Sequence, residues 1–171
     1  MPLPRPMSIS RWTAMLVAAL AVGWYLLGGQ QQEGGIGPEG VVLDASDPKL
    51  TGDGKQIYAA YCASCHGSNL EGQPDWRTRN ADGRLRAPPL DGTGNAWNQP
   101  DDRLFAITKY GAAAVTGREE ATDMPIFNGV LTDREIASAL SYIKSKWPPE
   151  IREKQKALNE ESRAGSGSPA E

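Results

Sequence analysis

The chain has 171 residues, which is enough for one modest domain with extensions. Its 21 acidic residues outnumber its 18 basic ones, so a basic surface for nucleic acid is not expected. Both of its two cysteines lie in one short motif, which excludes a disulfide scaffold, and 19 glycines and 13 prolines predict long loops.

The first apolar segment covers residues 12–29, which carry no charged side chain. As a helix it would span about 27 Å at about 1.5 Å per residue, close to the thickness of a bilayer core. Arg5 and Arg11 precede it, and no basic residue follows before Lys49. The positive-inside rule therefore predicts a cytoplasmic N-terminus (1–11) and an exported remainder.

The alternative for this segment is a cleaved signal peptide with an A-x-A-like site at Ala19–Ala21. Cleavage there would leave a very short apolar region, so we favour an uncleaved transmembrane anchor in a bacterial cytoplasmic membrane, with the domain in the periplasm. Residues 30–50 are expected to form a flexible tether rich in glycine and glutamine. A globular domain over 51–150 and a charged helical extension with a disordered tail over 151–171 would follow.

A helix is predicted over Lys55–Cys65, where apolar side chains recur at helical spacing up to the sequence Cys62-Ala63-Ser64-Cys65-His66. A C-x-x-C-H run is a signal for covalent haem attachment, in which two thiols form thioether bonds and the histidine ligates the iron. Two cysteines three positions apart on a helical turn point the same way. His66 directly follows them and is the only histidine in the chain.

A thioredoxin-type redox pair and half of a zinc site are the alternatives for a bare C-x-x-C. The redox pair would lie in a βαβ pattern, which is not visible here. A zinc site needs four ligands, and the chain has no further Cys or His beyond these three. One covalently attached haem c is therefore the expected cofactor, and its macrocycle would supply a large part of the core.

Two more helices are predicted in the second half of the domain. One covers Asp101–Tyr110, which follows Pro100 and stops at Gly111. The other begins with the capping-box pattern Thr132–Glu135 and keeps apolar residues at helical spacing up to Trp147. With no competing strand pattern, the domain is expected to be all-α with long loops.

The sixth position of a haem iron could hold methionine, water or lysine, or stay open, because no second histidine exists. Met1, Met7 and Met15 lie in or before the apolar segment, which leaves Met124 as the one methionine that the domain can use. Met124 precedes Pro125 in a loop, and the alternative is that it only fills the core. His/Met ligation would keep O₂ and peroxide off the iron, which favours electron transfer over oxygen chemistry.

The motifs C-A-S-C-H-G, A-P-P-L and M-P-I-F, followed by a capped last helix, resemble the class I (monohaem) cytochromes c over about residues 52–147. Residues 69–76 and 93–97 are similar to stretches of small proteobacterial membrane-anchored cytochromes c. The resemblance implies three or more helices and long loops around one covalent haem, with His66 and Met124 as the metal ligands.

The resemblance also implies roles for other residues. Pro88 corresponds to the proline whose carbonyl accepts the Nδ1–H of the haem-ligating histidine, although Pro88-Pro89 could simply stiffen the loop. Leu90 would pack on the haem face, and Trp97 would either donate its indole N–H to a propionate or cover the haem edge. A crossing of terminal helices is expected to involve Gly54 and Tyr58 with Tyr142 or Leu140.

Two segments depart from the simplest members of this family. Residues 112–122 lengthen the approach to Met124. Residues 67–87 form a long insert that carries Arg77, Arg79, Arg84 and Arg86. These arginines could neutralise propionates or steer an acidic partner, or they could form only a solvated loop face.

These observations predict a membrane-tethered electron carrier rather than an enzyme, with redox proteins as donor and acceptor and no small-molecule substrate. No nucleophile–base pair or carboxylate cluster for catalysis is visible. The alternatives are an electron-accepting cytochrome subunit of a periplasmic or membrane dehydrogenase or oxidase complex, and a haem-based sensor.

Overall fold

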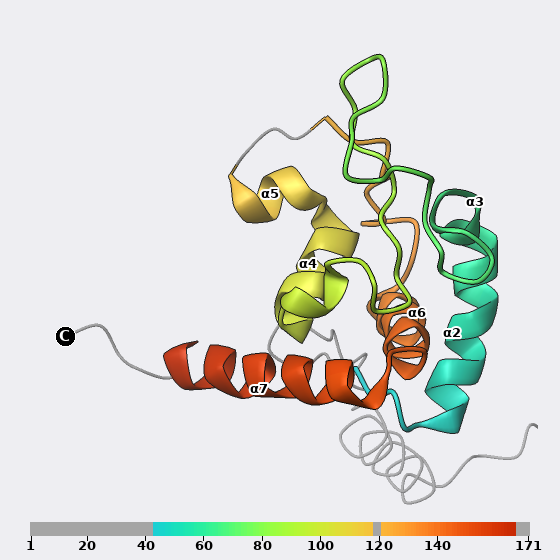
Figure 1. The fold of residues 1–171 in the computed structure, drawn as a ribbon. Helices are drawn as coiled ribbons and strands as arrows, with labels where there is room; N and C mark the ends of the chain where they lie inside the picture. The colour runs from blue at the N-terminus through green and yellow to red at the C-terminus, as the bar shows by residue number, and fades with distance from the viewer. Residues whose placement is uncertain (1–42, 118–120, 167–171) are drawn as a thin grey trace, which may run out of the picture. The chain divides into compact units, whose positions relative to one another are not determined.

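The computed structural model describes residues 43–117 and 121–166, and all of them belong to the second of two compact units, Met1–Gly35 and Ile36–Glu171. The described residues form six α-helices and one 3₁₀ helix: α2 (Pro48–Tyr61), α3 (Ala63–His66), η1 (Ala96–Asn98), α4 (Asp101–Tyr110), α5 (Ala112–Thr116), α6 (Asp133–Ser145) and α7 (Pro149–Ser166) (Figure 1). Between these helices the described chain has isolated β-bridges but no strand. The all-α expectation is confirmed for this part of the chain.

The predicted transmembrane segment, residues 12–29, lies outside the described residues. Among the helices of 43–117 and 121–166, none is both long enough and apolar enough to cross a bilayer.

Helix α2 begins at Pro48, well before the predicted start at Lys55 and inside the range assigned to the tether. The Asp47 side chain accepts hydrogen bonds from the backbone N–H groups of Lys49 and Leu50, at 2.8 and 3.0 Å. An aspartate N-cap followed by proline in the first turn is a strong helix start, because proline lacks only an N–H that would be unpaired there.

Helices α2 and α6 cross closely and form the centre of the domain (Figure 1). Gly54 lies at the crossing, where a Cβ atom would overlap the backbone carbonyl of Ser138. One turn further along α2, the Tyr58 ring packs on Tyr142 with centroids 5.5 Å apart. The crossing predicted through Gly54, Tyr58 and Tyr142 is therefore confirmed.

Helix-stop and capping signals in the sequence predict the positions of α4 and α6 correctly. The bounds of α4 match the prediction, and Gly111 ends it with a φ of 88°. At the start of α6 the Thr132 hydroxyl accepts from the Glu135 N–H, and the Glu135 carboxylate accepts from the Thr132 N–H, as in the predicted capping box. The helix ends at Ser145, before Trp147, which is 2% exposed.

Helix α7 is longer and less exposed than expected. The sequence predicted a charged helical extension and a disordered tail over residues 151–171, but α7 begins at Pro149 and extends to Ser166. Gln155 is 1% exposed and Asn159 is 9% exposed. These two polar side chains are buried because they have partners on α4 and its approach.

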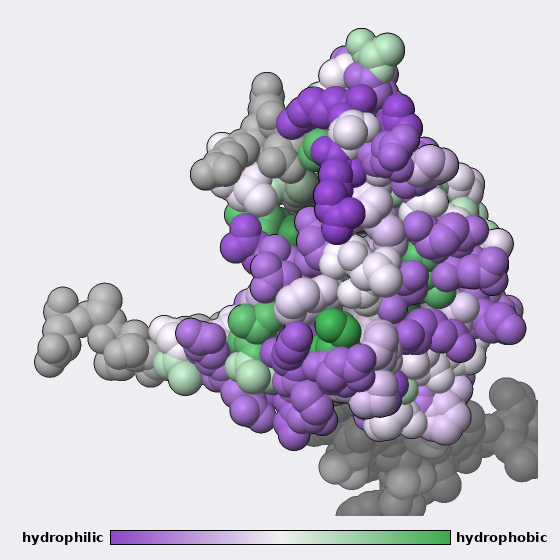
Figure 2. All heavy atoms as spheres, viewed as in Figure 1, coloured by the Kyte–Doolittle hydropathy of each residue, from purple (hydrophilic) through white to green (hydrophobic). Residues whose placement is uncertain are grey.

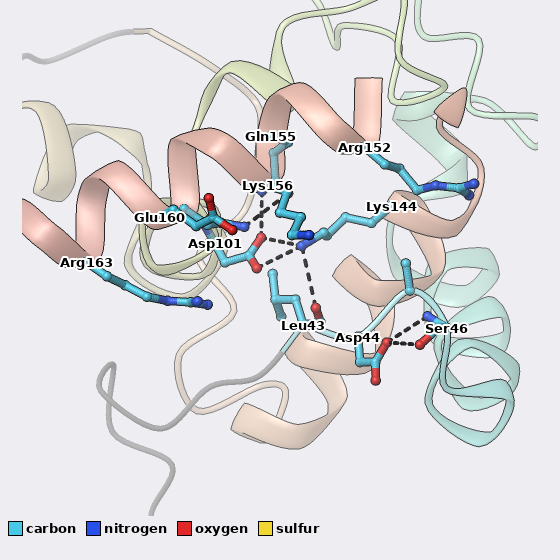
Figure 3. Close-up of a pocket in the computed structure, with 12 residues that line it drawn as sticks. Leu43, Asp44, Ser46, Asp101, Lys144, Arg152, Gln155, Lys156, Glu160 and Arg163 are labelled. Atoms are coloured by element: carbon cyan, nitrogen blue, oxygen red, sulfur yellow. Dashed lines mark hydrogen bonds and ion pairs between the residues drawn. The ribbon is translucent and has the colours of Figure 1, made fainter. Parts of the chain in front are cut away.

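The partners of α7 meet around an ion pair between Lys144 on α6 and Asp101 on α4, whose Nζ and Oδ1 atoms are 2.6 Å apart (Figure 3). The Gln155 amide donates to the Asp101 carboxylate at 2.6 Å, and the Asn159 carbonyl accepts from the Asp101 backbone N–H at 2.7 Å. The Lys144 ammonium also donates to the Leu43 carbonyl at 3.5 Å. The network joins α4, α6, α7 and the segment ahead of α2.

A pocket of about 540 Å³ opens beside this network (Figure 3). None of its lining residues is among the predicted haem residues. The face of the molecule in Figure 2 is largely hydrophilic, and its apolar residues gather in a few small patches.

Candidate functional site

The two cysteines lie on one helical turn at the junction of α2 and α3. The backbone N–H of Cys62 donates to the Tyr58 carbonyl and that of His66 donates to the Cys62 carbonyl, both at 2.9 Å. Both thiols are free; Cys62 is partly buried and Cys65 is exposed. Burial, with a smaller contribution from Cys65, raises the pKa of the Cys62 thiol to about 11. Because neither sulfur atom is in a disulfide, both could form thioether bonds.

The His66 ring is held by the backbone of a distant loop. Its Nδ1 atom lies 2.8 Å from the Pro88 carbonyl oxygen, and because a carbonyl can only accept, Nδ1 must carry the proton. Burial lowers the pKa of His66, and the bond to Pro88 opposes this. The ring is therefore neutral at pH 7, and the lone pair of Nε2 is available to a metal.

The loop that carries Pro88 approaches its neighbours closely. At Gly72, with a φ of 71°, a Cβ atom would overlap the backbone nitrogen of Pro89, and at Gly94 it would overlap the Pro89 carbonyl. The Gly72 N–H donates to the His66 carbonyl at 2.8 Å. This packing positions the Pro88 carbonyl toward His66, so the dipeptide does more than stiffen a loop.

Besides packing on Tyr142, Tyr58 stabilises the turn after His66 through its hydroxyl group. The Tyr58 hydroxyl donates to the Gly67 carbonyl at 2.6 Å, and burial raises the pKa of Tyr58, which keeps the hydroxyl protonated. Gly67 has a φ of 82°, a left-handed conformation that favours glycine. Sequence reasoning placed Tyr58 at the helix crossing but missed this bond, because nothing local to Tyr58 signals it.

Leu90 and Trp97 both pack on the hydrophobic core and are partly buried. The Leu90 carbonyl accepts from the Trp147 indole N–H at 2.9 Å, which explains why Trp147 is buried. The Lys154 ammonium lies 5.7 Å from the centroid of the Trp97 ring. Neither contact decides between the roles predicted for Trp97, and its contact with a haem stays a prediction, as does that of Leu90.

Met124 lies partly buried in a loop that reaches the cysteine motif through an aromatic contact. Its backbone N–H donates to the Thr122 hydroxyl at 3.2 Å. Phe127, three residues later, is 5% exposed and packs edge-on against Tyr61, with ring centroids 6.3 Å apart. Tyr61 directly precedes Cys62, so the fold brings the methionine loop to the end of α2 that carries the motif.

The residues at this site fit a haem better than a bare metal ion. The described residues contain no group of three or more Cys, His, Asp or Glu side chains that could hold an ion. Tyr61, Ile126 and Val130 are large apolar side chains that remain exposed by 45%, 57% and 58%. The Nε atom of Arg86 is buried and has no hydrogen-bond partner in the described part of the chain, and a haem propionate would be a suitable acceptor for it.

A C-x-x-C-H motif on a helical turn of an all-α domain, with its imidazole oriented by a backbone carbonyl, is typical of the c-type cytochrome class of protein. Comparison with known families agrees: residues 50–143 match the family described as "Cytochrome C oxidase, cbb3-type, subunit III". The match covers more than half of the chain, and the chain belongs to this family. Membership implies covalently bound haem c and a role in electron transport.

Two relatives illustrate the extent of the similarity. The cytochrome bc1 complex cytochrome c subunit of Mycobacterium leprae (strain TN) is 32% identical over 109 residues, which cover 63% of this chain and 31% of the relative. The protein with the same description from Mycobacterium tuberculosis (strain ATCC 25618 / H37Rv) is 47% identical over 38 residues, 22% of this chain and 14% of the relative. The chain thus spans less than a third of these relatives, and no solved structure matches it.

Proposed function

We propose that the protein is a monohaem cytochrome c of class I that passes single electrons between redox proteins, with His66 and Met124 as the iron ligands. The observation that carries the proposal is the 2.8 Å contact between His66 Nδ1 and the Pro88 carbonyl, next to two free thiols. This contact commits one ring nitrogen to the protein and leaves the other for iron. A bound haem would supply the one-electron redox couple.

Met124 is proposed as the sixth ligand because it is the only methionine after residue 15. The Tyr61–Phe127 contact brings its loop to the cysteine motif. A thioether is a soft, neutral ligand that favours the ferrous state, so His/Met ligation raises the reduction potential relative to two histidines. One C-x-x-C-H motif supports a single haem.

The second candidate function is an electron-accepting cytochrome subunit of a larger oxidoreductase complex. The names of the mycobacterial relatives, which are cytochrome c subunits of the cytochrome bc1 complex, favour it. The short alignments leave most of those subunits without a counterpart in this chain. Such a subunit would be recovered together with its complex, whereas a free carrier would not.

We also propose that residues 12–29 anchor the protein in the bacterial cytoplasmic membrane and that the haem domain lies in the periplasm. The uncharged segment with arginines only on its N-terminal side supports this orientation. A soluble periplasmic protein, released by signal-peptide cleavage, is the alternative.

Purification of the full chain from membranes in mild detergent tests the function and the anchor together. We expect a denatured mass that includes one covalently attached haem, and a redox titration that follows a single one-electron step. Two redox steps or a haem lost on denaturation would contradict the monohaem proposal. A mature chain that begins after Ala21 would contradict the anchor, and stable co-purification with a dehydrogenase or oxidase would favour the subunit function.

A further inference from the structure

The two segments that lengthen this chain relative to the simplest class I cytochromes lie against each other. The backbone N–H of Leu85, in the insert 67–87, donates to the Ala121 carbonyl at 2.8 Å, and Leu85 forms a parallel β-bridge with Thr122. In Figure 1 the chain after residue 120, in orange, runs beside the green loop of the insert. The insert is therefore packed against the approach to Met124.

The insert is an ordered loop with internal bonds of its own. At its base the Gln73 N–H donates to the Ala87 carbonyl and the Ala87 N–H donates to the Gln73 side chain, both at 2.9 Å. Near its tip the Asn80 N–H donates to the Arg84 carbonyl at 2.9 Å. This loop can therefore act as a fixed support.

Arg84 connects this support to the methionine loop through its side chain. Its Nη1 atom lies 2.9 Å from the Asp123 carboxylate and donates to the Thr122 carbonyl at 3.2 Å. With the bond between Leu85 and Ala121, three consecutive residues before Met124 are each held by residues 84–85. The Thr122 hydroxyl then accepts from the Met124 N–H.

On its other side, the methionine loop is attached to α4. The N–H of Phe127 donates to the Thr108 carbonyl at 3.4 Å, and that of Asn128 donates to the Lys109 carbonyl at 2.9 Å. Met124 thus lies between two attachments, one to α4 and one to the insert. The bonds to α4 are between backbone groups, whereas the attachment to the insert includes the Arg84 side chain, which can be changed without altering a helix.

We propose that Arg84 is a positioning residue that fixes residues 121–123 and thereby keeps Met124 at the haem iron. The inference rests on the proposed ligation by Met124. Its physical basis is an equilibrium between a closed state, in which Met124 is bound to the iron, and an open state, in which its loop has moved away. Any contact made only in the closed state stabilises that state and lowers the fraction of open molecules. The Arg84 and Asp123 side chains are 46% and 61% exposed, so the expected effect is modest.

Imidazole titration of the ferric, haem-loaded full-length protein measures the open fraction, because imidazole can bind only where Met124 has left the iron. We expect Arg84→Gln to bind imidazole about two- to fivefold more tightly than wild type. Arg77→Gln is the matched control, since it removes the same charge from the same insert while its described contact is with the Trp76 ring, 4.3 Å from the guanidinium carbon. Arg84→Lys keeps the positive charge, so its affinity for imidazole should lie between those of Arg84→Gln and wild type.

Asp123→Asn should tighten imidazole binding less than Arg84→Gln does, because the bond from Arg84 to the Thr122 carbonyl remains, and the double variant should bind imidazole no more tightly than Arg84→Gln alone. Equal affinities for Arg84→Gln, Arg77→Gln and wild type would overturn the proposal. Hydrogen exchange gives a readout that does not depend on the iron ligand: amides of 121–127 should exchange faster in Arg84→Gln than in Arg77→Gln. A wild-type spectrum without the Met–iron signature would refute the proposed ligation by Met124. Separately, amide exchange in residues 121–127 that is the same in Arg84→Gln as in wild type would refute the role of Arg84.

Discussion

At the scale of single residues, the orientation of His66 depends on a backbone carbonyl that no side-chain substitution can remove. The Pro88 carbonyl fixes the tautomer of the ring, and burial keeps it neutral. The hydroxyl of Tyr58 acts one residue further along, on the Gly67 carbonyl. A substitution of Tyr58 can therefore test how much this side chain stabilises the turn after His66.

We expect Tyr58→Phe to lower the free energy of unfolding by about 1–2 kcal/mol, because it leaves the partly buried Gly67 carbonyl without its donor. The ring and its packing on Tyr142 remain. Urea denaturation of the haem-loaded protein measures the change. Tyr61→Phe, at a position 45% exposed, is the control and should stay within about 0.5 kcal/mol of wild type. Equal losses in the two variants would show that the Tyr58 bond adds no stability.

At the scale of secondary-structure elements, the crossing of α2 and α6 sets the geometry of the domain. Gly54 allows the α2 backbone to approach the Ser138 carbonyl, and the Tyr58–Tyr142 pair fills the space beside it. Because α2 leads into the cysteine motif and α6 follows the methionine loop, their crossing relates the two halves of the site.

Gly54→Ala should destabilise the protein by about 3 kcal/mol, because the added Cβ would overlap backbone that cannot move without separating the helices. Gly52→Ala provides a matched control on the same helix, where a Cβ would meet nothing within 4 Å. That control should instead gain about 0.5–1 kcal/mol from helix propensity. Thermal unfolding of both variants decides the matter, and a neutral Gly54→Ala would contradict the close crossing.

The elements that the sequence predicted correctly are those with local signals. Gly111 stops α4, and the Thr132–Glu135 capping box starts α6. The start of α2 was missed because Asp47-Pro48 follows a glycine-rich stretch that favours a tether. The burial of Gln155 was missed because its partner, Asp101, is distant in the sequence.

The same distinction applies to the site. Cys62, Cys65 and His66 are adjacent in sequence, so their spacing alone indicated their joint role. The partner of His66, Pro88, came from the family resemblance, and in the structure its carbonyl lies 2.8 Å from His66 Nδ1. The contact between Arg84 and Asp123 could not be predicted, because it depends on how two long loops fold against each other.

At the scale of the whole domain, Asp101 is the point where α7 joins the rest of the fold, because it pairs with Lys144 of α6 and bonds to two side chains of α7. The two side chains of the ion pair are only 10% and 13% exposed, and Gln155 and Asn159 bring α7 to the same point. The region matched by the family ends at residue 143, and α7 lies beyond it.

Asp101→Ala should cost about 3 kcal/mol of stability, because it leaves the Lys144 ammonium nearly buried without its counter-charge. Asp102→Ala changes the neighbouring exposed residue of the same first turn and should cost less than about 1 kcal/mol through the helix dipole. Chemical denaturation measures both. Similar losses would mean that the ion pair contributes no more than a surface charge.

The central claim, that one haem is held by His66 and Met124, is tested most directly by the long-wavelength absorption band that marks Met–iron coordination in ferric haem proteins. The full-length ferric protein should be low-spin and show this band. Met124→Ala should abolish it, while Met15→Leu, which changes a methionine of the N-terminal apolar segment, should keep it. A high-spin wild type, or a band that persists in Met124→Ala, would contradict the account.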